Sequence, residues 1–587
     1  MEKEELEQFN QKQEMFRHSM SHVLAKAIKQ LYPNVKVAIG PAIDNGFYYD
    51  FDNLNVTPED FNKIEEKMRE IIAKNEDFVR KEISRSEALE MFKDEPYKTE
   101  LINELPADSI ISIYYTGEDF VDLCRGPHVE NTKYLRGFSF KINRVSGAYW
   151  RGSEKNKMLT RVYVYGFINK DDLKECLRLE EEAKERDHRK LGKDLGIFMF
   201  NDLVGRGLPM WLPKGFIVRR ELNDYIMNKE YALGYQHVMT PSLGNVNLYK
   251  TSGHWDHYKE DMFPAMEVDE EAYVLRPMNC PHHMVMFKNF KHSYRDLPLR
   301  VAEIANDFRF EASGSLCGIE RTRAFTQNDS HIFCRPDQIK QEVEGVIGLI
   351  LDVYKDFGFK NYKFRLSLRD KENTEKYFGN DDLWEKSETA LREILQQSGA
   401  EYYEAEGEAA FYGPKIDVQV KSAIGHDITL STVQLDYQLP ERFELEYVDE
   451  NDGRSRPVVI HRAILGSLDR FVAFILEETK GILPVWLSPV QAKIITVSDN
   501  NSEYAKQVEN QLKMAGVRVE SDLNNESVGK KIRNAVLEKT PYIIVLGDKE
   551  MEDKSVAVRT RGSKDTVTMS YADFEAKIKQ EIANKSL

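Results

Sequence analysis

Arginine side chains flank a turn rich in glycine and serine within residues 303–333. One arm reads Glu-Ile-Ala-Asn-Asp-Phe-Arg-Phe-Glu, the turn contains Ser313, Gly314 and Gly318, and the other arm reads Arg-Thr-Arg-Ala-Phe from Arg321. A hairpin of two strands with arginines on both sides can hold a triphosphate, because a guanidinium is always charged and donates bidentately. A surface salt bridge is the commoner role of any single arginine, so this motif needs support from the rest of the chain.

Histidine and cysteine side chains near the N-terminus form a second group that could do chemistry. His18 and His22 are four residues apart and therefore share one face of a helix, roughly opposite its apolar stripe. The run Asp-Leu-Cys-Arg-Gly-Pro-His at 122–128 adds Cys124 and His128. Zinc accepts ligands of these types, so spacing alone leaves a metal site and a metal-free pocket equally open.

A third group consists of Cys280, His331 and His461, which have the side chains that bind zinc. Three protein ligands leave a fourth position open, which is the catalytic rather than the structural arrangement. The separations of 51 and 130 residues carry no metal signature of their own. Cysteine is commonly a small buried hydrophobe, so residue type alone also fits three ordinary core residues.

The elements that must position these side chains follow from hydrophobic patterns. The first helix is predicted over 13–32, and a second over 56–75 begins where Thr57 can cap and Pro58 suits the first turn. Alternation predicts strands at 110–115 and 159–164. From residue 488 onward apolar strands alternate with helices, which indicates an α/β layer with a mostly parallel sheet.

Length and composition indicate a multidomain globular protein. A chain of 587 residues is too long for one core. We expect four segments, 1–168, a charged linker helix at 169–194, 195–487 and 488–587. There is no apolar stretch of membrane-spanning length and no apolar core of a signal peptide. Five scattered cysteines predict a reducing, cytoplasmic setting. The net charge of −16 argues against nucleic-acid binding unless basic residues cluster locally.

Three segments together carry a family resemblance: Val-Leu-Arg-Pro-Met-Asn-Cys-Pro-His-His at 274–283, Thr-Gln-Asn-Asp-Ser-His-Ile-Phe at 326–333, and Val-Val-Ile-His-Arg-Ala-Ile-Leu-Gly-Ser-Leu-Asp-Arg-Phe at 458–471. They resemble the catalytic domain of the threonyl-tRNA synthetases, a family of class II aminoacyl-tRNA synthetases. The resemblance implies an α+β multidomain fold with an antiparallel-sheet catalytic domain, an α+β editing domain and a C-terminal α/β anticodon-binding domain. It also implies a homodimer built through 207–241, and by comparison with many bacterial relatives we expect the TGS domain to be missing.

The resemblance assigns the ATP site to the arginine hairpin and to the Gly-Ser-Leu-Asp-Arg segment that ends at Arg470. Arg309 is implied to contact the α-phosphate, Glu311 the adenine amino group, and Arg321 and Arg470 the γ-phosphate, with Phe325 stacked on adenine. Mg²⁺ accompanies ATP in this family. The residues implied to act in catalysis are Arg309, Arg470 and Lys415.

The resemblance likewise implies a zinc ion held by Cys280, His331 and His461. The amino-acid pocket is implied to be lined by Met278, Gln327, Asp329, Tyr412, Lys415 and Gln434. Threonine is an amino alcohol that can fill open zinc positions with its amine and hydroxyl. A site that binds a hydroxyl rejects an analogue without one by about 10⁴–10⁵, which excludes valine.

Serine is also an amino alcohol, and one missing methyl group gives only about 10–200-fold discrimination. The zinc chemistry therefore predicts a second, hydrolytic site that removes serine from tRNA(Thr). The N-terminal group resembles the threonyl editing domain, which is metal-free by family precedent, and we follow that precedent. The implied editing residues are His18, His22, Lys98, Asp122, Cys124 and His128.

Residues 488–587 resemble the anticodon-binding domain of the same subgroup, and the implied anticodon contacts are Asn525, Lys549, Glu550 and Arg559. The expected function is ATP-dependent ligation of L-threonine to tRNA(Thr) through a threonyl-adenylate, with editing of seryl-tRNA(Thr). One alternative is a catalytically inactive RNA-binding paralogue, which the complete set of motif arginines disfavours. Another is a class II synthetase for serine or proline, from which zinc analysis would discriminate.

Overall fold

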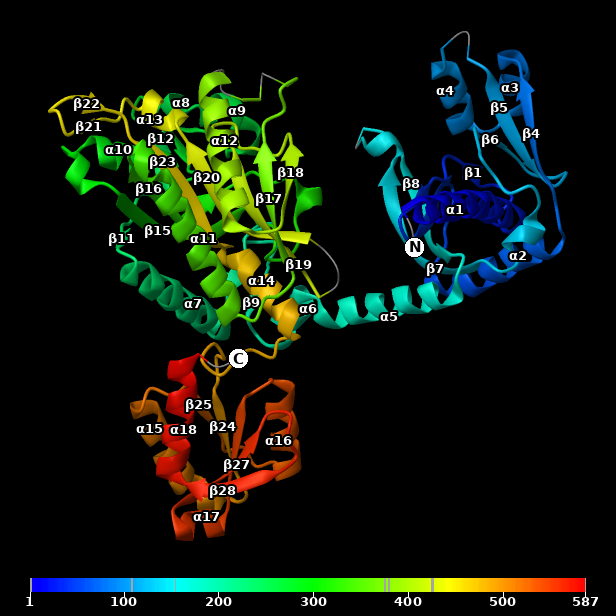
Figure 1. Cartoon of the computed structure of the whole chain (residues 1–587). Coiled ribbons are helices and arrows are strands. Elements are labelled where there is room, and N and C mark those ends of the chain that lie inside the picture. Colours follow the sequence, from blue (N-terminus) through cyan, green and yellow to red (C-terminus); the bar gives the residue numbers. More distant parts are fainter. Residues whose placement is uncertain are drawn as a thin grey trace. The chain divides into compact units, whose positions relative to one another are not determined.

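The protein is described here by a computed structural model covering residues 3–106, 109–153, 155–373, 376–377, 381–423 and 427–585. The chain divides into two compact units, Met1–Glu182 and Ala183–Leu587 (Figure 1). Among the described helices, none combines the length and the apolar character needed to cross a bilayer.

The first unit is a helix–sheet assembly built around α1 (Lys3–Leu31). The predicted helix over 13–32 is confirmed as the later part of α1, which begins ten residues earlier. One sheet has the order β1-β3-β8-β7 with β2 beside β3, and its strands are β1 (Lys36–Val37), β2 (Ala42–Ile43), β3 (Gly46–Asp52), β7 (Ser139–Tyr149) and β8 (Met158–Phe167). Met20, Leu24 and Ile28 of α1 are fully buried in the core that this sheet shares with α2 (Phe61–Ala73).

A smaller sheet of the first unit, in the order β4-β5-β6, carries part of a candidate site. Its elements are β4 (Phe78–Ile83), α3 (Arg85–Met91), α4 (Pro96–Glu104), β5 (Ile111–Thr116) and β6 (Val121–Leu123). The strands predicted at 110–115 and 159–164 are confirmed as β5 and β8. The expected single linker helix is two helices, α5 (Lys170–Arg186) and α6 (His188–Asp194), because Asp187 leaves helical geometry and caps α6 by accepting from the Arg189 N–H.

The second unit is centred on an eight-stranded sheet in the order β11-β15-β16-β23-β20-β19-β17-β18. It is antiparallel except at β11–β15 and β17–β18, and its strands are β11 (Gln236–His237), β15 (Leu299–Phe308), β16 (Ala324–Cys334), β17 (Tyr362–Leu368), β18 (Tyr402–Glu406), β19 (Lys415–Lys421), β20 (Asp427–Asp436) and β23 (Val458–Ser467). One face packs on α11 (Ile339–Asp356), α12 (Asp381–Ser398) and α14 (Leu468–Thr479) through residues such as Ile332, Val433 and Ile460. Since side chains alternate along a strand, residues 331, 434 and 461 point to the other face.

Short elements cover the edges and the open face of this sheet. They are β9 (Phe198–Met199), β10 (Met210–Trp211), α7 (Pro213–Ala232), β12 (Leu243–Asn245), α8 (Val246–Ser252), α9 (His254–His257), β13 (Met266–Val268), β14 (Glu271–Leu275), α10 (Cys280–Lys288), α13 (Gln438–Arg442), β21 (Tyr447–Val448) and β22 (Arg454–Ser455). The long helix expected within 207–241 is α7, and the strand after it, β11, ends before Pro241.

The C-terminal region has a five-stranded sheet in the order β25-β24-β26-β27-β28. The strands are β24 (Ala492–Thr496), β25 (Val519–Asp522), β26 (Tyr542–Leu546), β27 (Ser555–Thr560) and β28 (Thr566–Ser570), and the helices are α15 (Ser502–Met514), α16 (Val528–Leu537), α17 (Asp548–Asp553) and α18 (Tyr571–Asn584). The predicted alternation is confirmed, and β25, β24 and β26 are parallel. The sequence did not indicate the antiparallel extension through β27 and β28.

Candidate functional site

Four predicted site residues form one row across the central sheet. Lys415 pairs with Gln434 between β19 and β20, Gln434 with His461 between β20 and β23, and His461 with His331 between β23 and β16. Directly paired residues project to the same face of a sheet. The row therefore gathers an ammonium, an amide and two imidazoles from four strands on the face opposite α11 and α14.

The three candidate metal ligands meet at one end of this row. Cys280 is the first residue of α10, and it is buried with His331 and His461. The ligand atoms of the three side chains lie within 4.8 Å of one another. Burial raises the pKa of the Cys280 thiol well above its ordinary value, so a thiolate at this position needs a cation beside it.

Two orphaned ring nitrogens show that these residues fit a metal ion. Within the described part of the chain, the buried His331 Nε2 and His461 Nδ1 have no hydrogen-bond partner. The Asp329 carboxylate is 3.7 Å from His331 Nε2, and burial followed by the charge of Asp307 raises the pKa of Asp329. Two imidazole lone pairs and one sulfur make a donor set that suits zinc and leaves a position open for a further ligand.

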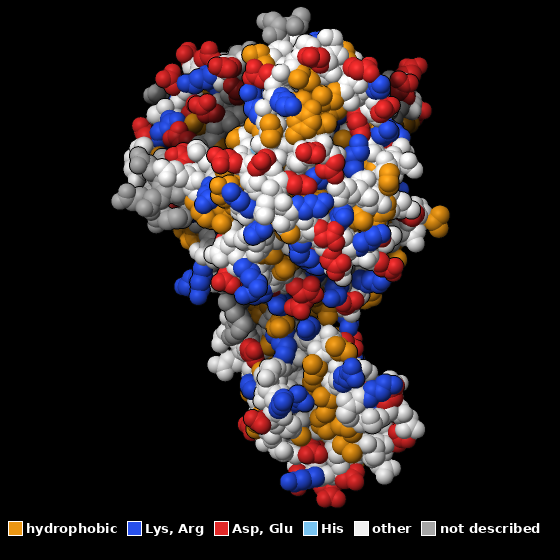
Figure 2. Space-filling view, turned by 90° about the vertical axis from the view of Figure 1, so that its right-hand side faces the viewer, with side chains coloured by type: hydrophobic (Ala, Val, Ile, Leu, Met, Phe, Trp, Pro, Cys, Tyr) orange, Lys and Arg blue, Asp and Glu red, His pale blue; other side chains and the backbone are white. Residues whose placement is uncertain are grey.

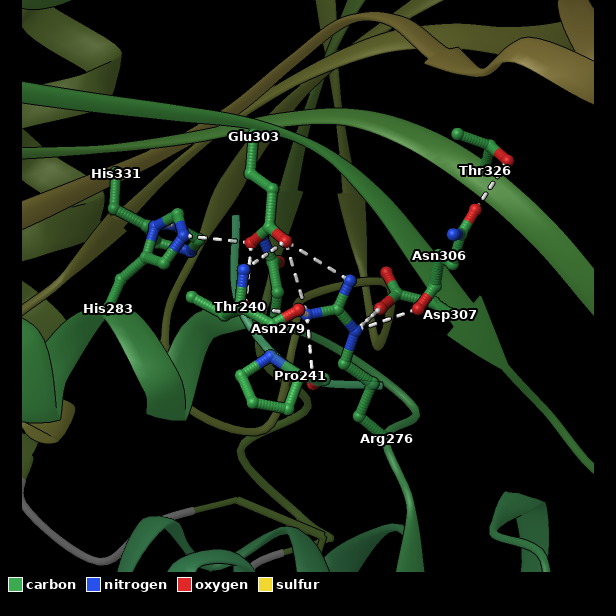
Figure 3. A network of polar contacts seen from close by, with 10 residues as sticks. All are labelled: Thr240, Pro241, Arg276, Asn279, His283, Glu303, Asn306, Asp307, Thr326 and His331. Atoms are coloured by element: carbon green, nitrogen blue, oxygen red, sulfur yellow. Dashed lines mark hydrogen bonds and ion pairs between the residues drawn. The ribbon is translucent and has the colours of Figure 1, made fainter. Parts of the chain in front are cut away.

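A buried polar network supports the segment between β14 and α10 (Figure 3). The Arg276 guanidinium lies 3.3 Å from Glu303 Oε1 and 3.2 Å from Asp307 Oδ1. Arg276 also donates to the Asn306 carbonyl and to the Thr240 hydroxyl. The network ties the strand before Cys280 to β15, and it thereby fixes where α10 begins.

The predicted ATP residues line a single cavity of about 340 Å³. Its walls contain Arg309, Glu311, Arg321, Phe325 and Arg470, together with Gln327, Lys415 and Gln434 of the predicted amino-acid pocket. The Arg309 guanidinium lies 5.0 Å from the centre of the Phe325 ring, and Arg321 Nε lies 3.1 Å from Glu311 Oε2. The three arginines from two motifs thus give the cavity a cationic wall that suits a triphosphate.

Two further residues of the predicted amino-acid pocket, Tyr412 and Met278, lie close to candidate metal ligands. The Tyr412 hydroxyl donates to Gln434 Oε1 at 2.5 Å, and its ring centre is 5.0 Å from that of His461. Met278 packs against the cluster that contains Cys280. Lys415 Nζ lies 2.6 Å from Asp417 Oδ2, so the ammonium is held by a buried carboxylate while it faces the cavity.

The six predicted editing residues come together in the first unit. Cys124 Sγ lies 3.3 Å from His18 Nε2 and 3.2 Å from His128 Nε2. His22 Nε2 lies 3.6 Å from Asp122 Oδ2, and Lys98 forms an ion pair with the same carboxylate. Ligand atoms of the three histidines and Cys124 are all within 4.8 Å of one another, a geometry that a metal ion and a metal-free pocket would both fit.

Burial dominates the protonation of this cluster. It lowers the pKa of His18, His22 and His128 below the usual 6.5. It raises the pKa of the Cys124 thiol to about 11. The imidazoles are therefore neutral acceptors near pH 7 and the cysteine is a thiol, which disfavours Cys124 as a free nucleophile.

The predicted anticodon residues are only partly brought together. Asn525 follows β25, and Lys549 and Glu550 lie in α17 directly after β26. Because β25 and β26 are parallel members of one sheet, these three lie beyond the same edge. Arg559 pairs with Ile543, at the opposite end of β26, and donates to the Ser563 carbonyl.

Comparison with known proteins agrees with this arrangement. Residues 262–479 match the family "tRNA synthetase class II core domain (G, H, P, S and T)", residues 491–581 the "Anticodon binding domain", and residues 111–163 the "Threonyl and Alanyl tRNA synthetase second additional domain". The threonine–tRNA ligase of Geobacillus sp. (strain WCH70) is 55% identical over 97% of this chain and 88% of that protein.

The chain belongs to the threonine–tRNA ligase family.

A second curated relative and a solved structure are also similar to this chain. The threonine–tRNA ligase of Staphylococcus carnosus (strain TM300) is 54% identical over 97% of this chain and 88% of its own length. A crystal structure described as the RNA binding domain of threonyl-tRNA synthetase from Cryptosporidium parvum Iowa II is 40% identical, with a TM-score of 0.65. It covers 67% of this chain and 98% of that one.

This threonine–tRNA ligase family member also has residues near the site that sequence reasoning missed. His254 of α9 is buried, its Nδ1 lies 2.8 Å from the Ser252 hydroxyl, and its ring centre is 5.1 Å from that of Phe411. Asp436 lies 2.8 Å from His461 Nε2. A single histidine in Gly-His-Trp and an aspartate that ends a strand carry no periodic or spacing signal that could have identified them.

Proposed function

We propose that this chain joins L-threonine to tRNA(Thr) in two steps, forming threonyl-adenylate from ATP and then transferring the threonyl group to the tRNA. The observation that carries the proposal is the cross-strand row, which puts the candidate metal ligands beside a cavity with a cationic wall. Such a site can hold an amino alcohol and a triphosphate together, and class II activation requires little more than positioning and charge stabilisation.

In the first step Arg309, Arg321 and Arg470 bind the phosphates of ATP, which Mg²⁺ accompanies, and Phe325 supports the adenine. Cys280 Sγ, His331 Nε2 and His461 Nδ1 would hold one zinc ion, which when bound supplies Lewis-acid positions for the amine and hydroxyl of threonine. Gln434, fixed by the Tyr412 hydroxyl, and Asp329 complete the threonine pocket. Lys415 adds positive charge near the reacting carboxylate.

Domain roles follow the same proposal: editing in 1–168, a connection through 169–194, catalysis in 195–487 and anticodon binding in 488–587. Asn525, Lys549 and Glu550 would read exposed loop bases at one edge of the C-terminal sheet, as single-stranded RNA is recognised by stacking and base-edge contacts. Arg559 would contact the RNA elsewhere on that sheet. Because this reaction uses the ATP and tRNA of the cytoplasm, we place the protein there.

The editing pocket is proposed to hydrolyse seryl-tRNA(Thr) with a positioned water. The neutral His18, His22 and His128 can accept a proton from this water. Lys98 and Asp122 form an ion pair beside them in the editing pocket. We follow the metal-free mechanism here. The zinc content of Cys280→Ser decides this point, because this variant should lose the zinc of the catalytic site. One remaining ion per chain would show a metal in the editing cluster, and the metal-free mechanism predicts none.

Threonine-dependent ATP–pyrophosphate exchange by the zinc-loaded protein is the principal test. We expect exchange with threonine and serine but not with valine. Cys280→Ser should lose both zinc and threonine binding. The matched control is Cys334→Ser, because Cys334 is equally buried on β16 but packs into the opposite core. An absence of exchange by zinc-loaded protein would favour the inactive RNA-binding paralogue.

A further inference from the structure

His283, which has no role in the proposal above, lies between a candidate metal ligand and a buried carboxylate (Figure 3). Its Nδ1 is 2.8 Å from His331 Nδ1, and its Nε2 is 3.1 Å from Glu303 Oε2. All three side chains are buried. They form a continuous line of hydrogen bonds from β15 through α10 to β16, and the line ends at the orphaned His331 Nε2.

The far end of this line is a carboxylate surrounded by donors. Glu303 accepts from the Thr240 N–H and hydroxyl, each at 2.9 Å, and from the Asn279 amide at 3.2 Å. The Arg276 guanidinium lies 3.3 Å away. An ionised carboxylate only accepts hydrogen bonds, so His283 Nε2 must carry the proton that is shared with Glu303.

The near end of the line is set by the metal. A histidine that binds a metal through Nε2 must carry its proton on Nδ1. The only described partner of His331 Nδ1 is His283 Nδ1, which is free to accept because the His283 proton is on Nε2. Both ends therefore require one proton on His283 Nε2 and one on His331 Nδ1. This arrangement leaves both imidazoles neutral.

We propose that Glu303 and His283 are positioning residues that hold the His331 proton on Nδ1 and so direct the Nε2 lone pair at the metal. This inference rests on the zinc site proposed above. It adds two residues that touch neither substrate nor metal, and that act by choosing the tautomer and the ring orientation of one ligand.

The second imidazole ligand has the reverse arrangement, which supports the assignment. Asp436 Oδ2 lies 2.8 Å from His461 Nε2, so Nδ1 is the nitrogen left for the metal. The backbone N–H groups of Gln438 and Leu439 fix that carboxylate at 2.7 and 3.0 Å. The rings of His331 and His461 are 4.6 Å apart at 83°. Each ring thus has one nitrogen paired through a carboxylate-anchored hydrogen bond and the other free.

The hydrogen-bonded line from Glu303 through His283 to His331 is called the relay below. Zinc affinity, measured by competition with a chromophoric chelator, tests the relay without relying on activity. His283→Leu removes the acceptor, and we expect zinc binding to weaken about 10–100-fold. His283→Asn keeps an amide oxygen near the position of Nδ1 and should retain more affinity than the leucine variant. His292→Leu is the matched control, since His292 lies beyond the end of α10 and the described contacts of its side chain are with the carbonyl and the ring of Phe287.

The unaltered protein with cobalt in place of zinc provides a second test. Two solvent-exchangeable, hyperfine-shifted N–H resonances are expected, one from His331 Nδ1 and one from His461 Nε2. His283→Leu should shift or remove the first and preserve the second. The relay is overturned if the parent protein shows no His331 N–H resonance, or if it binds zinc no more tightly than His283→Leu. A parent protein that binds no zinc overturns the zinc site itself, and the relay with it.

Discussion

Arg309 is held by two aromatic rings at the cavity wall, 5.0 Å from the Phe325 centre and 5.8 Å from that of Tyr258. Stacking fixes the guanidinium plane, so its donors keep their direction when a phosphate arrives. A lysine would keep the charge but lose the bidentate geometry.

We therefore expect Arg309→Lys to reduce the rate of threonine-dependent pyrophosphate exchange by about 10²–10³-fold, as for the loss of one transition-state donor. Arg323→Lys is the control, because Arg323 stacks on Phe310 in the same hairpin but lies outside the cavity lining. Equal losses in both variants would contradict a direct role of Arg309 with phosphate.

The editing histidines give a prediction about pH. Burial lowers the folded-state pKa of His18, His22 and His128. Below pH 6.5 these histidines therefore bind protons in the unfolded chain but stay neutral in the folded protein. Stability contributed by this region is therefore complete above pH 6.5 and is lost as pH falls, by up to about 1.4 kcal/mol per pH unit for each histidine.

Hydrogen exchange of the full chain, followed by mass spectrometry and corrected for intrinsic rates, measures this loss locally. Peptides from α1 and β6 should lose protection between pH 7.5 and 5.5, and His22→Gln should make the loss smaller. Peptides from β24, which lies far from these histidines in sequence and in another unit, are the internal reference. A parallel decline in β24 would show that the editing histidines are not the cause.

At the scale of elements, His188 connects three parts of the catalytic region. The imidazole begins α6, its Nδ1 is 2.7 Å from Glu477 Oε1 of α14, and its Nε2 accepts from the Ile319 N–H in the turn of the arginine hairpin. Gly318 packs so closely that an added Cβ would lie 2.1 Å from Nε2. One buried side chain thus fixes the turn that carries Arg321.

His188→Leu should raise the KM for ATP about tenfold, because unpairing a partly buried carboxylate and a buried N–H costs about 1–3 kcal/mol and frees the turn. ATP titrations of pyrophosphate exchange measure the effect. The control is Lys190→Leu, which changes an exposed residue of the same helix. An unchanged KM with a lowered melting temperature would assign His188 a purely structural role.

Several elements could be predicted from the sequence because their signals are local. The hairpin of 303–333 is confirmed as β15 and β16. Their paired residues run from Leu299 opposite Phe333 to Phe308 opposite Ala324. The roles of Cys280 and His461 could not be found this way, since strand register is set by packing between distant segments. His283 was hidden for the same reason: it lies on α10 and its partner Glu303 lies on β15, and a polar residue in a helix carries no indication of its neighbour.

At the scale of the whole molecule, the exposed apolar residues in and around 207–241 support the homodimer that the family resemblance implies. Leu203 is 99% exposed and Met239 is 93% exposed, and Phe216 and Leu243 are also exposed. On the face drawn in Figure 2, acidic and basic side chains are interspersed. Lys531 is buried and donates to Thr496, so its charge does not belong to the exposed surface.

Met239→Glu should shift the protein from dimer to monomer in sedimentation velocity at micromolar concentration, because it places a charge in an apolar contact. Met514→Glu is the control, since Met514 is 90% exposed and lies outside the segment 207–241 that is expected to build the interface. A dimer that persists in Met239→Glu would show that the subunits meet elsewhere.

The pairing of His331 with His461 would give a zinc ion bound as proposed a structural effect as well as a part in substrate choice. A slip of β23 by one residue against β16 would turn the His461 imidazole toward the opposite face, away from Cys280. A zinc ion bound as proposed would therefore stabilise only the correct register of these two strands.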